Sequence, residues 1–241
     1  MTSPSFGINW NEVNRMVSSN TRMIIINTPH NPTGSVLNDD DMRALEKIVE
    51  DRDIIVVSDE VYEHLVYDGH RHLSAAMYPE IASRCFVVGS FGKTLHATGW
   101  KVGYALAPAF LMKEFRKLHQ YVVFAVNTPV QHAIADYLDR HDLSELSSFY
   151  QQKRDYFLQK IAGSRFKPIP AKGTYFQVLD YSRISDMPET EFAEHLIKNY
   201  GIASIPMSPF YREKINRKQL RFCFAKKEET IDKAAEILCR I

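Results

Sequence analysis

Short apolar runs alternate with longer amphipathic stretches over the first hundred residues. Four runs are almost wholly apolar and have the length of β-strands, at residues 23–27, 54–57, 85–88 and 102–106. Between the first two, Asn38 is a candidate N-cap for a helix in which apolar residues recur at helical spacing. Apolar strands separated by helices are typical of a mostly parallel sheet with helices on both faces. The pattern therefore predicts an α/β fold.

The pattern changes after residue 107. A mostly helical region extends to about residue 162, and residues 146–161 have the length of a helix that links two domains. Two later stretches alternate like half-exposed strands and two are amphipathic like helices, at 175–179, 220–224, 189–198 and 229–241 respectively. We therefore expect three parts: a large domain over residues 1–145, a linking helix over 146–162 and a smaller α+β domain over 163–241.

Composition excludes several classes of partner. The 241 residues include 30 basic and 29 acidic side chains, for a net charge of +1, which favours neither nucleic acid nor an anionic membrane. No apolar run approaches the length of a membrane span, and no secretory signal is visible. Three cysteines without CxxC spacing are typical of free thiols in an intracellular protein. We expect a cytoplasmic protein without a bound metal.

Polar residues follow the predicted strands at their carboxyl ends, where sheets of this kind bind ligands. The sharpest of these signals is Gly92-Lys93-Thr94, which resembles the end of a phosphate-binding P-loop. A P-loop requires a glycine five positions before Gly92, where Val87 stands, so the spacing argues against a nucleoside triphosphatase. The amine of Lys93 can instead attack a cofactor aldehyde and form a Schiff base. A solvated surface lysine is the third interpretation, and Lys93 alone does not decide between them.

Three further residues fit an aromatic cofactor. Asp59 can keep a pyridine nitrogen protonated, which makes the ring a better electron sink, or it can cap a helix. Tyr62 lies one helical turn further on and can bond a phenolate oxygen of the ring, or pack in the core. Asn31 lies in a loop that Pro32 and Gly34 make rigid. Its amide can donate to the same oxygen, or Asn31 can be a turn residue without a role in binding.

Charged and hydroxyl groups for phosphate and carboxylate are also present. Ser90 and Lys101 can bind a phosphate, one through its hydroxyl and the other through its charge. Arg221 alternates with Leu220 and Phe222 in a predicted strand and so faces the opposite side from them. Its guanidinium can hold a substrate carboxylate bidentately, although an exposed strand arginine explains the pattern equally well.

Together these segments resemble the class I and II aminotransferases, the fold-type-I enzymes that depend on pyridoxal phosphate. Five motifs occur in the order of that family and span almost the whole chain: NTPHNPTG at 27–34, SDEVYE at 58–63, SFGKTLHATGWKVGY at 90–104, KGTYF at 172–176 and LRFCFAK at 220–226. The sequence around these motifs is most similar to the methionine and kynurenine/glutamine aminotransferase subgroup. The resemblance implies part of the large domain of that fold followed by its smaller α+β domain.

The resemblance also implies a role for each candidate residue. Lys93 holds pyridoxal 5'-phosphate covalently and acts as the general base. The other cofactor contacts are Asp59 to the pyridine nitrogen, Asn31 and Tyr62 to the ring oxygen, and Ser90 and Lys101 to the phosphate. The substrate contacts are Arg221 to the α-carboxylate, Asn31 beside it, and Phe124, which falls in a stretch that lines the pocket of a neighbouring subunit. A homodimer is therefore implied.

The implied activity is transfer of an amino group from an amino acid to a 2-oxo acid. Methionine, aromatic or glutamine-like substrates are expected from the subgroup. Two alternatives remain open: a carbon–sulfur β-lyase, which uses the same first proton abstraction, and a non-catalytic dimerising remnant.

Two departures from the family pattern affect these expectations. Many members have arginine where this sequence has Lys101, which keeps the charge but loses the planar fork. Family chains are also longer before the first motif, in a part that supplies the helix whose backbone amides hold the phosphate. We therefore expect weak cofactor binding and slow or no turnover from these 241 residues alone.

Overall fold

The computed structural model describes residues 5–241, which divide into two compact units. Among these residues, the first unit contains 5–29 together with Val36–Val66 and Arg71–Leu146. The second unit contains His30–Ser35, Tyr67–His70 and Ser147–Ile241. Two short loops that lie early in the sequence thus belong to the later unit. The assignment of residues 1–145, 146–162 and 163–241 to separate domains stays a prediction.

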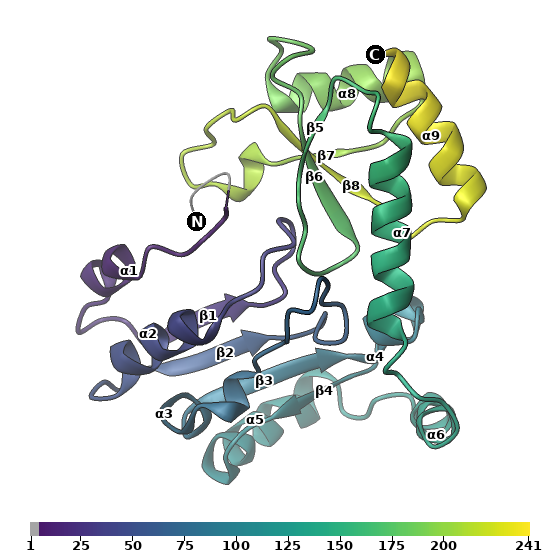
Figure 1. Cartoon of the computed structure of the whole chain (residues 1–241). Helices are drawn as coiled ribbons and strands as arrows, with labels where there is room; N and C mark the ends of the chain where they lie inside the picture. Colours follow the sequence, from purple (N-terminus) through teal and green to yellow (C-terminus); the bar gives the residue numbers. More distant parts are fainter. Residues whose placement is uncertain (1–4) are drawn as a thin grey trace. The chain divides into compact units, whose positions relative to one another are not determined.

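A four-stranded sheet forms the centre of the first unit (Figure 1). Its strands, in sheet order, are β1 (Met23–Asn27), β2 (Ile55–Asp59), β3 (Cys85–Ser90) and β4 (Gly103–Leu106). The first three are parallel and β4 is antiparallel to β3. All four predicted strands are present within two residues of their expected bounds, and the predicted α/β class is confirmed.

The first unit also contains helices. They are α1 (Trp10–Met16), α2 (Asp39–Val49), α3 (Pro79–Ala82), α4 (Phe91–Thr94), α5 (Ala109–Val122) and α6 (Thr128–Leu138), with short 3₁₀ turns at Ala75–Met77 and Thr98–Trp100. The predicted cap of α2 is confirmed as a capping box: Asn38 Oδ1 accepts from the backbone N–H of Asp41 at 2.9 Å, and Asp41 Oδ2 accepts from that of Asn38 at 3.0 Å.

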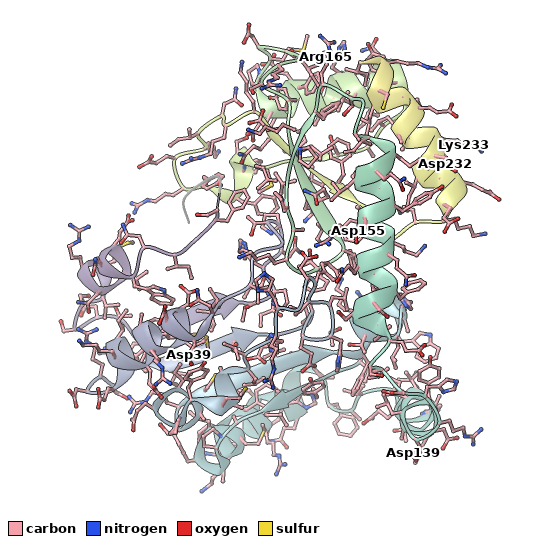
Figure 2. The ribbon with its side chains drawn as sticks, viewed as in Figure 1. Asp39, Asp139, Asp155, Arg165, Asp232 and Lys233 are labelled. Carbon is pink, nitrogen blue, oxygen red and sulfur yellow. The ribbon has the colours of Figure 1, made fainter. Side chains whose placement is uncertain are left out.

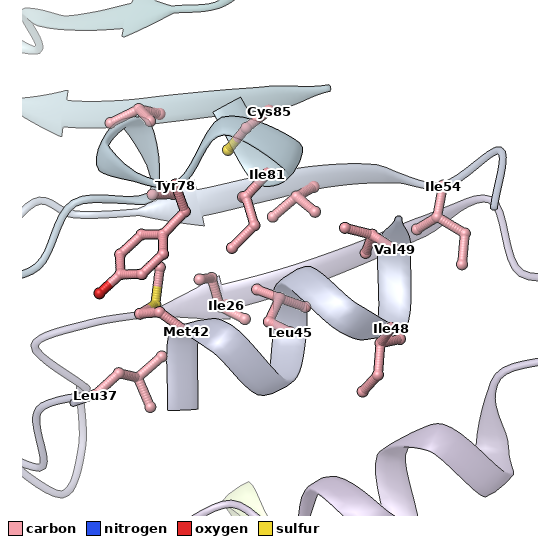
Figure 3. Close-up of a cluster of buried hydrophobic side chains, with 13 residues drawn as sticks. Ile26, Leu37, Met42, Leu45, Ile48, Val49, Ile54, Tyr78, Ile81 and Cys85 are labelled. Atoms are coloured by element: carbon pink, nitrogen blue, oxygen red, sulfur yellow. The ribbon is translucent and has the colours of Figure 1, made fainter. Parts of the chain in front are cut away.

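The core of the first unit lies between one face of this sheet and the helices α2 and α3 (Figure 3). Met42, Leu45 and Val49 from α2 are fully buried there, together with Val56 of β2 and Ile81 of α3. Burial alternates along β2 and β3, as expected for strands with one face in this core. On the other face, Phe86 of β3 contacts Phe115 of α5, with ring centroids 5.9 Å apart.

A second four-stranded sheet, antiparallel throughout, forms the centre of the second unit. Its strands, in sheet order, are β5 (Lys167–Ile169), β6 (Phe176–Asp180), β8 (Gln219–Cys223) and β7 (Ile205–Pro206). The helices α7 (Leu146–Lys160), α8 (Glu189–Tyr200) and α9 (Glu228–Arg240) accompany it, with a 3₁₀ turn at Ser208–Phe210. Figure 2 labels Asp232 on α9. Its carboxylate accepts from the hydroxyl of Tyr156 and pairs with Lys160 of α7, both at 2.8 Å.

Hydrogen bonds attach the two early loops to the second unit. The carbonyl of Gly34 accepts from the backbone N–H groups of Lys172 and Gly173, at 2.8 and 2.9 Å. A Cβ at Gly34 would lie 2.6 Å from that of Ala171, and φ is +72°, so only glycine fits this close approach. Arg154 of α7, 5% exposed, binds both carboxylate oxygens of Asp68 at 2.7 Å. These contacts hold the loops 30–35 and 67–70 in fixed positions within the unit.

Candidate functional site

Asp59 is the last residue of β2, beside Asn27 of β1 and Val88 of β3 in the sheet. Its half-buried carboxylate accepts from the backbone N–H of Val61 at 3.3 Å. Burial raises the pKa of Asp59 above its usual range, and the charge of Lys93 acts in the opposite direction. A cationic partner at this strand end would therefore stabilise the ionised carboxylate.

A pocket of about 300 Å³ lies at the end of β3 in the same unit. Its lining residues come from β3, α4 and the segment that leads into β4: Ser90, Gly92, Lys93, Thr98, Lys101, Val102 and Gly103. Three of the predicted site residues, Ser90, Lys93 and Lys101, thus line one pocket. Two ammonium groups and a hydroxyl around one space form a donor set that suits a phosphate.

The backbone around this pocket is constrained. Lys101 has a left-handed conformation with φ +55°, which is costly for a residue with a side chain. A Cβ at Gly103 would lie 2.5 Å from the carbonyl oxygen of Gly89, so the two strands approach closely beside the pocket. Strain of this kind is concentrated at functional sites, where the surrounding structure enforces it.

Tyr62 and Phe124, the other candidates in the first unit, have opposite environments. Tyr62 lies in the turn after β2 and is only 2% exposed, which suits a packed aromatic as well as a cofactor contact. Phe124 follows α5 and is 85% exposed, with φ +65°. Leu118, Tyr121 and Val122 beside it are also at least 69% exposed. An exposed apolar cluster of this size is unusual on a monomer surface.

Asn31 and Arg221 belong to the second unit and lie in direct contact there. Arg221 Nη1 donates to Asn31 Oδ1 at 2.5 Å. Its guanidinium carbon lies 3.9 Å from the centroid of the Phe176 ring, in a cation–π contact. Leu220 and Phe222, on either side of Arg221, are buried on the other face of β8, as alternation predicts. The side chain of Arg221 is therefore held in one orientation.

Some contacts near the candidate site residues, in each of the two units, are not indicated by the sequence. Phe176, which stacks under Arg221, ends the motif KGTYF and opens the strand paired with β8, and nothing in the motif predicts its contact with Arg221. Tyr104 of β4 donates to the carboxylate of Glu63 and packs over Gly89, where a Cβ would lie 2.1 Å from its ring. The contacts of Phe176 with Arg221 and of Tyr104 with Gly89 depend on strand register, which the sequence does not specify.

The chain belongs to the class I and II aminotransferase family, whose sequence profile matches residues 1–238. Members of this family depend on pyridoxal phosphate. Lys93, Ser90 and Lys101 around one pocket, with the Asp59 carboxylate nearby, fit that cofactor, which combines an aldehyde, a phosphate and a basic ring nitrogen.

Individual relatives include the methionine aminotransferase of Escherichia coli, which is 44% identical over 238 residues covering 98% of this chain and 61% of the relative. Human kynurenine–oxoglutarate transaminase 1 is 35% identical over 92% of this chain and 58% of its own. The chain thus spans about three fifths of the length of these relatives.

Solved structures agree with the fold. A structure from Escherichia coli whose published description identifies a methionine aminotransferase function matches with a TM-score of 0.97 and 43% identity, covering 100% of this chain and 64% of the other. N-succinyldiaminopimelate aminotransferase from Mycobacterium tuberculosis matches with a TM-score of 0.94 and 34% identity, covering 100% and 63%. No helix among residues 5–241 is long and apolar enough to cross a membrane.

Proposed function

We propose that this chain carries the lysine-bearing and carboxylate-binding part of a pyridoxal-phosphate-dependent aminotransferase. The observation that carries the proposal is the pocket in which Lys93 meets Ser90 and Lys101 at the carboxyl end of the sheet, with Asp59 beside it. An aldehyde cofactor with a phosphate and a basic ring needs this combination of groups. The glycine spacing that a nucleotide-binding P-loop also needs is absent, because Val87 stands five positions before Gly92.

Each residue of the first unit then has a defined task. Pyridoxal phosphate, when bound, supplies an aldehyde that reacts with amines and a ring that withdraws electrons. Lys93 Nζ would hold this group covalently, and its free amine would accept the proton from the substrate Cα. Asp59 would bind the ring nitrogen, and Tyr62 would bind the ring oxygen. Ser90 and Lys101 would bind the phosphate and so fix the position of the cofactor.

Residues of the second unit bind the substrate. The oriented guanidinium of Arg221 holds the α-carboxylate of the amino acid, because a planar fork matches a carboxylate in two parallel hydrogen bonds. Asn31 and Phe176 keep the guanidinium in place, one by a hydrogen bond and the other by stacking. Asn31 also contacts the cofactor ring oxygen in this proposal.

The names of the relatives support the substrate class. Proteins similar to this chain are a methionine aminotransferase and kynurenine–oxoglutarate transaminases. We infer that the complete protein moves the amino group of methionine, or of an aromatic or glutamine-like amino acid, to a 2-oxo acid in the cytoplasm.

Visible spectroscopy tests the cofactor assignment. Pyridoxal phosphate added to the purified protein should produce a visible absorbance band that Lys93→Ala abolishes. Lys47→Ala, which changes an exposed lysine on α2, is the matched control and should keep the band. Equal bands in the wild type and Lys93→Ala would refute the assignment. Conversion of methionine to its 2-oxo acid identifies the aminotransferase, whereas pyruvate and thiol released from cysteine conjugates identify a β-lyase.

We also propose a homodimer that uses the exposed cluster of Leu118, Tyr121, Val122 and Phe124. Four neighbouring apolar side chains that are at least 69% exposed are costly in water, and a second copy would bury them. Sedimentation velocity tests this proposal. The double variant Tyr121→Ser/Phe124→Ser should shift the protein toward a monomer, whereas the same change at exposed Tyr137 should not. A wild-type monomer at all accessible concentrations would contradict the proposal.

A further inference from the structure

A buried carboxylate lies directly beside the candidate cofactor site. Glu60 follows Asp59 at the end of β2, and its side chain is only 1% exposed. Oε1 accepts from the hydroxyl of Ser58 at 2.7 Å and from the backbone N–H of Ala75 at 2.9 Å. Oε2 lies 2.7 Å from Nε2 of His72. A buried acid with three partners is uncommon unless the structure depends on its position.

The geometry of this pair identifies the donor. Nδ1 of His72 is buried and has no hydrogen-bond partner, whereas Nε2 lies 2.7 Å from Oε2 of Glu60. Nε2 is therefore the nitrogen that donates to the carboxylate. Burial raises the pKa of Glu60, but the hydrogen bonds from His72, Ala75 and Ser58 outweigh it and leave the pKa below its usual value. Glu60 therefore stays negatively charged.

Strand geometry relates Glu60 to Asp59. Side chains alternate along a strand, and both Ser58 and Glu60 are buried while Asp59 between them is half-buried and points to the other face. The main chain at this point is held from both sides. The carbonyl of Asp59 accepts from the backbone N–H of Thr28 at 3.0 Å, and the N–H of Glu60 donates to the carbonyl of Val88 at 2.9 Å.

We propose that Glu60 and His72 are a positioning pair for Asp59, which holds the end of β2 so that the Asp59 carboxylate keeps its direction toward the cofactor. The pair anchors the residue that follows Asp59 to the segment before the 3₁₀ turn Ala75–Met77. The pair also places a permanent negative charge next to Asp59. This inference rests on the proposed function only for the role of Asp59, because the contacts themselves need no cofactor.

Several ionisable groups lie close to Glu60, and their charges affect the measured pKa of Asp59. The charge of Glu60 raises the pKa of Asp59, and the charge of Lys93 lowers it. Cys85 of β3 and Tyr104 of β4 also experience the charge of Glu60, and burial raises the pKa of each. Removing the charge of Glu60 should therefore lower the pKa of Asp59.

The test uses the protein without cofactor, so that its outcome is independent of catalysis. Carbon-13 NMR measures the pKa of the Asp59 carboxyl, and hydrogen exchange of the Val61 amide reports its hydrogen bond with that carboxyl. In Glu60→Gln the pKa of Asp59 should fall by about half a unit and the Val61 amide should exchange faster. His72→Leu keeps the charge of Glu60, so it should speed exchange of the Val61 amide without lowering the pKa of Asp59. His72→Gln, which keeps an N–H donor, should restore much of the wild-type exchange.

Control variants distinguish a positioning role of Glu60 from an effect on protein stability alone. Glu50→Gln changes an exposed acid at the end of α2 and should leave both readouts unchanged. Where Glu60→Gln does not fold, Ser58→Ala removes a single donor to Glu60 and should speed exchange of the Val61 amide to a smaller extent. Variants that lower the unfolding midpoint while Asp59 and Val61 keep their wild-type values would overturn the proposal. Absence of a Lys93-dependent absorbance band would instead refute the proposed function and leave this inference intact.

Discussion

Arg221 donates a hydrogen bond to Asn31, a residue 190 positions away in the sequence. The bond joins strand β8 to the loop 30–35, and Gly34 attaches that loop to Lys172 and Gly173. Phe176, which stacks under the guanidinium, opens the strand that pairs with β8. The orientation of one side chain thus depends on three segments of the second unit, and each of them contains one of the family motifs.

Replacing Arg221 with lysine tests this orientation. Arg221→Lys keeps the charge but loses the planar fork, so the variant can form only single hydrogen bonds to a carboxylate. We expect the KM for the amino acid to rise about ten- to a hundredfold, which corresponds to roughly 1.4–2.8 kcal/mol. The cofactor absorbance should not change. Steady-state kinetics of the complete protein measure the effect, with Arg240→Lys at the exposed end of α9 as the control. An unchanged KM would show that Arg221 does not bind the carboxylate.

Lys101 should govern affinity for the phosphate. Lys101→Met removes one of two ammonium groups that line the pocket, so the Kd for pyridoxal phosphate should rise about tenfold or more. Lys101→Arg should lower the Kd, because a guanidinium offers paired donors to phosphate oxygens. Absorbance titration measures both variants, and Lys47→Met serves as the control for the loss of charge. Equal affinities in Lys101→Met and the wild type would place the phosphate elsewhere.

Gly89 is expected to tolerate no side chain. A Cβ there would lie 2.1 Å from the ring of Tyr104, and the ring is held by its hydrogen bond to Glu63. Gly89→Ala should therefore destabilise the protein by about 1–3 kcal/mol in chemical denaturation. The second substitution Tyr104→Leu should recover part of that loss. Gly163→Ala is the matched control, since nothing lies within 4 Å of its added Cβ.

The fold was predictable where the signal is local. The strands β1 to β3 are apolar runs beside turn residues, and Asn38 begins α2 by a capping box that its own sequence specifies. The antiparallel direction of β4 could not be predicted, because it depends on the path of the connection from β3. The strands β5 and β7, of three and two residues, are too short to show a period.

The site was predictable to the extent that it follows strand ends. Ser90, Lys93 and Lys101 line one pocket because α/β sheets place their ligands at these ends. The burial of Glu60 could not be predicted, because a charged residue next to a strand is usually exposed. Its burial results from contacts with His72 and Ala75, 12 and 15 residues away. Long-range packing of this kind leaves no periodic pattern in the sequence.

His30 should make stability depend on pH. Burial lowers its pKa from 6.5 to about 4, and Nδ1 lies 2.7 Å from the hydroxyl of Thr33. As pH falls below 6.5 the unfolded chain takes up a proton that the folded chain still excludes, so stability declines until pH reaches about 4. The contribution is at most about 3 kcal/mol. Urea midpoints between these pH values should fall less steeply in His30→Gln than in the wild type, and His132→Gln, at an exposed site, should keep the wild-type slope. Equal slopes in all three proteins would show that folding does not lower the pKa of His30.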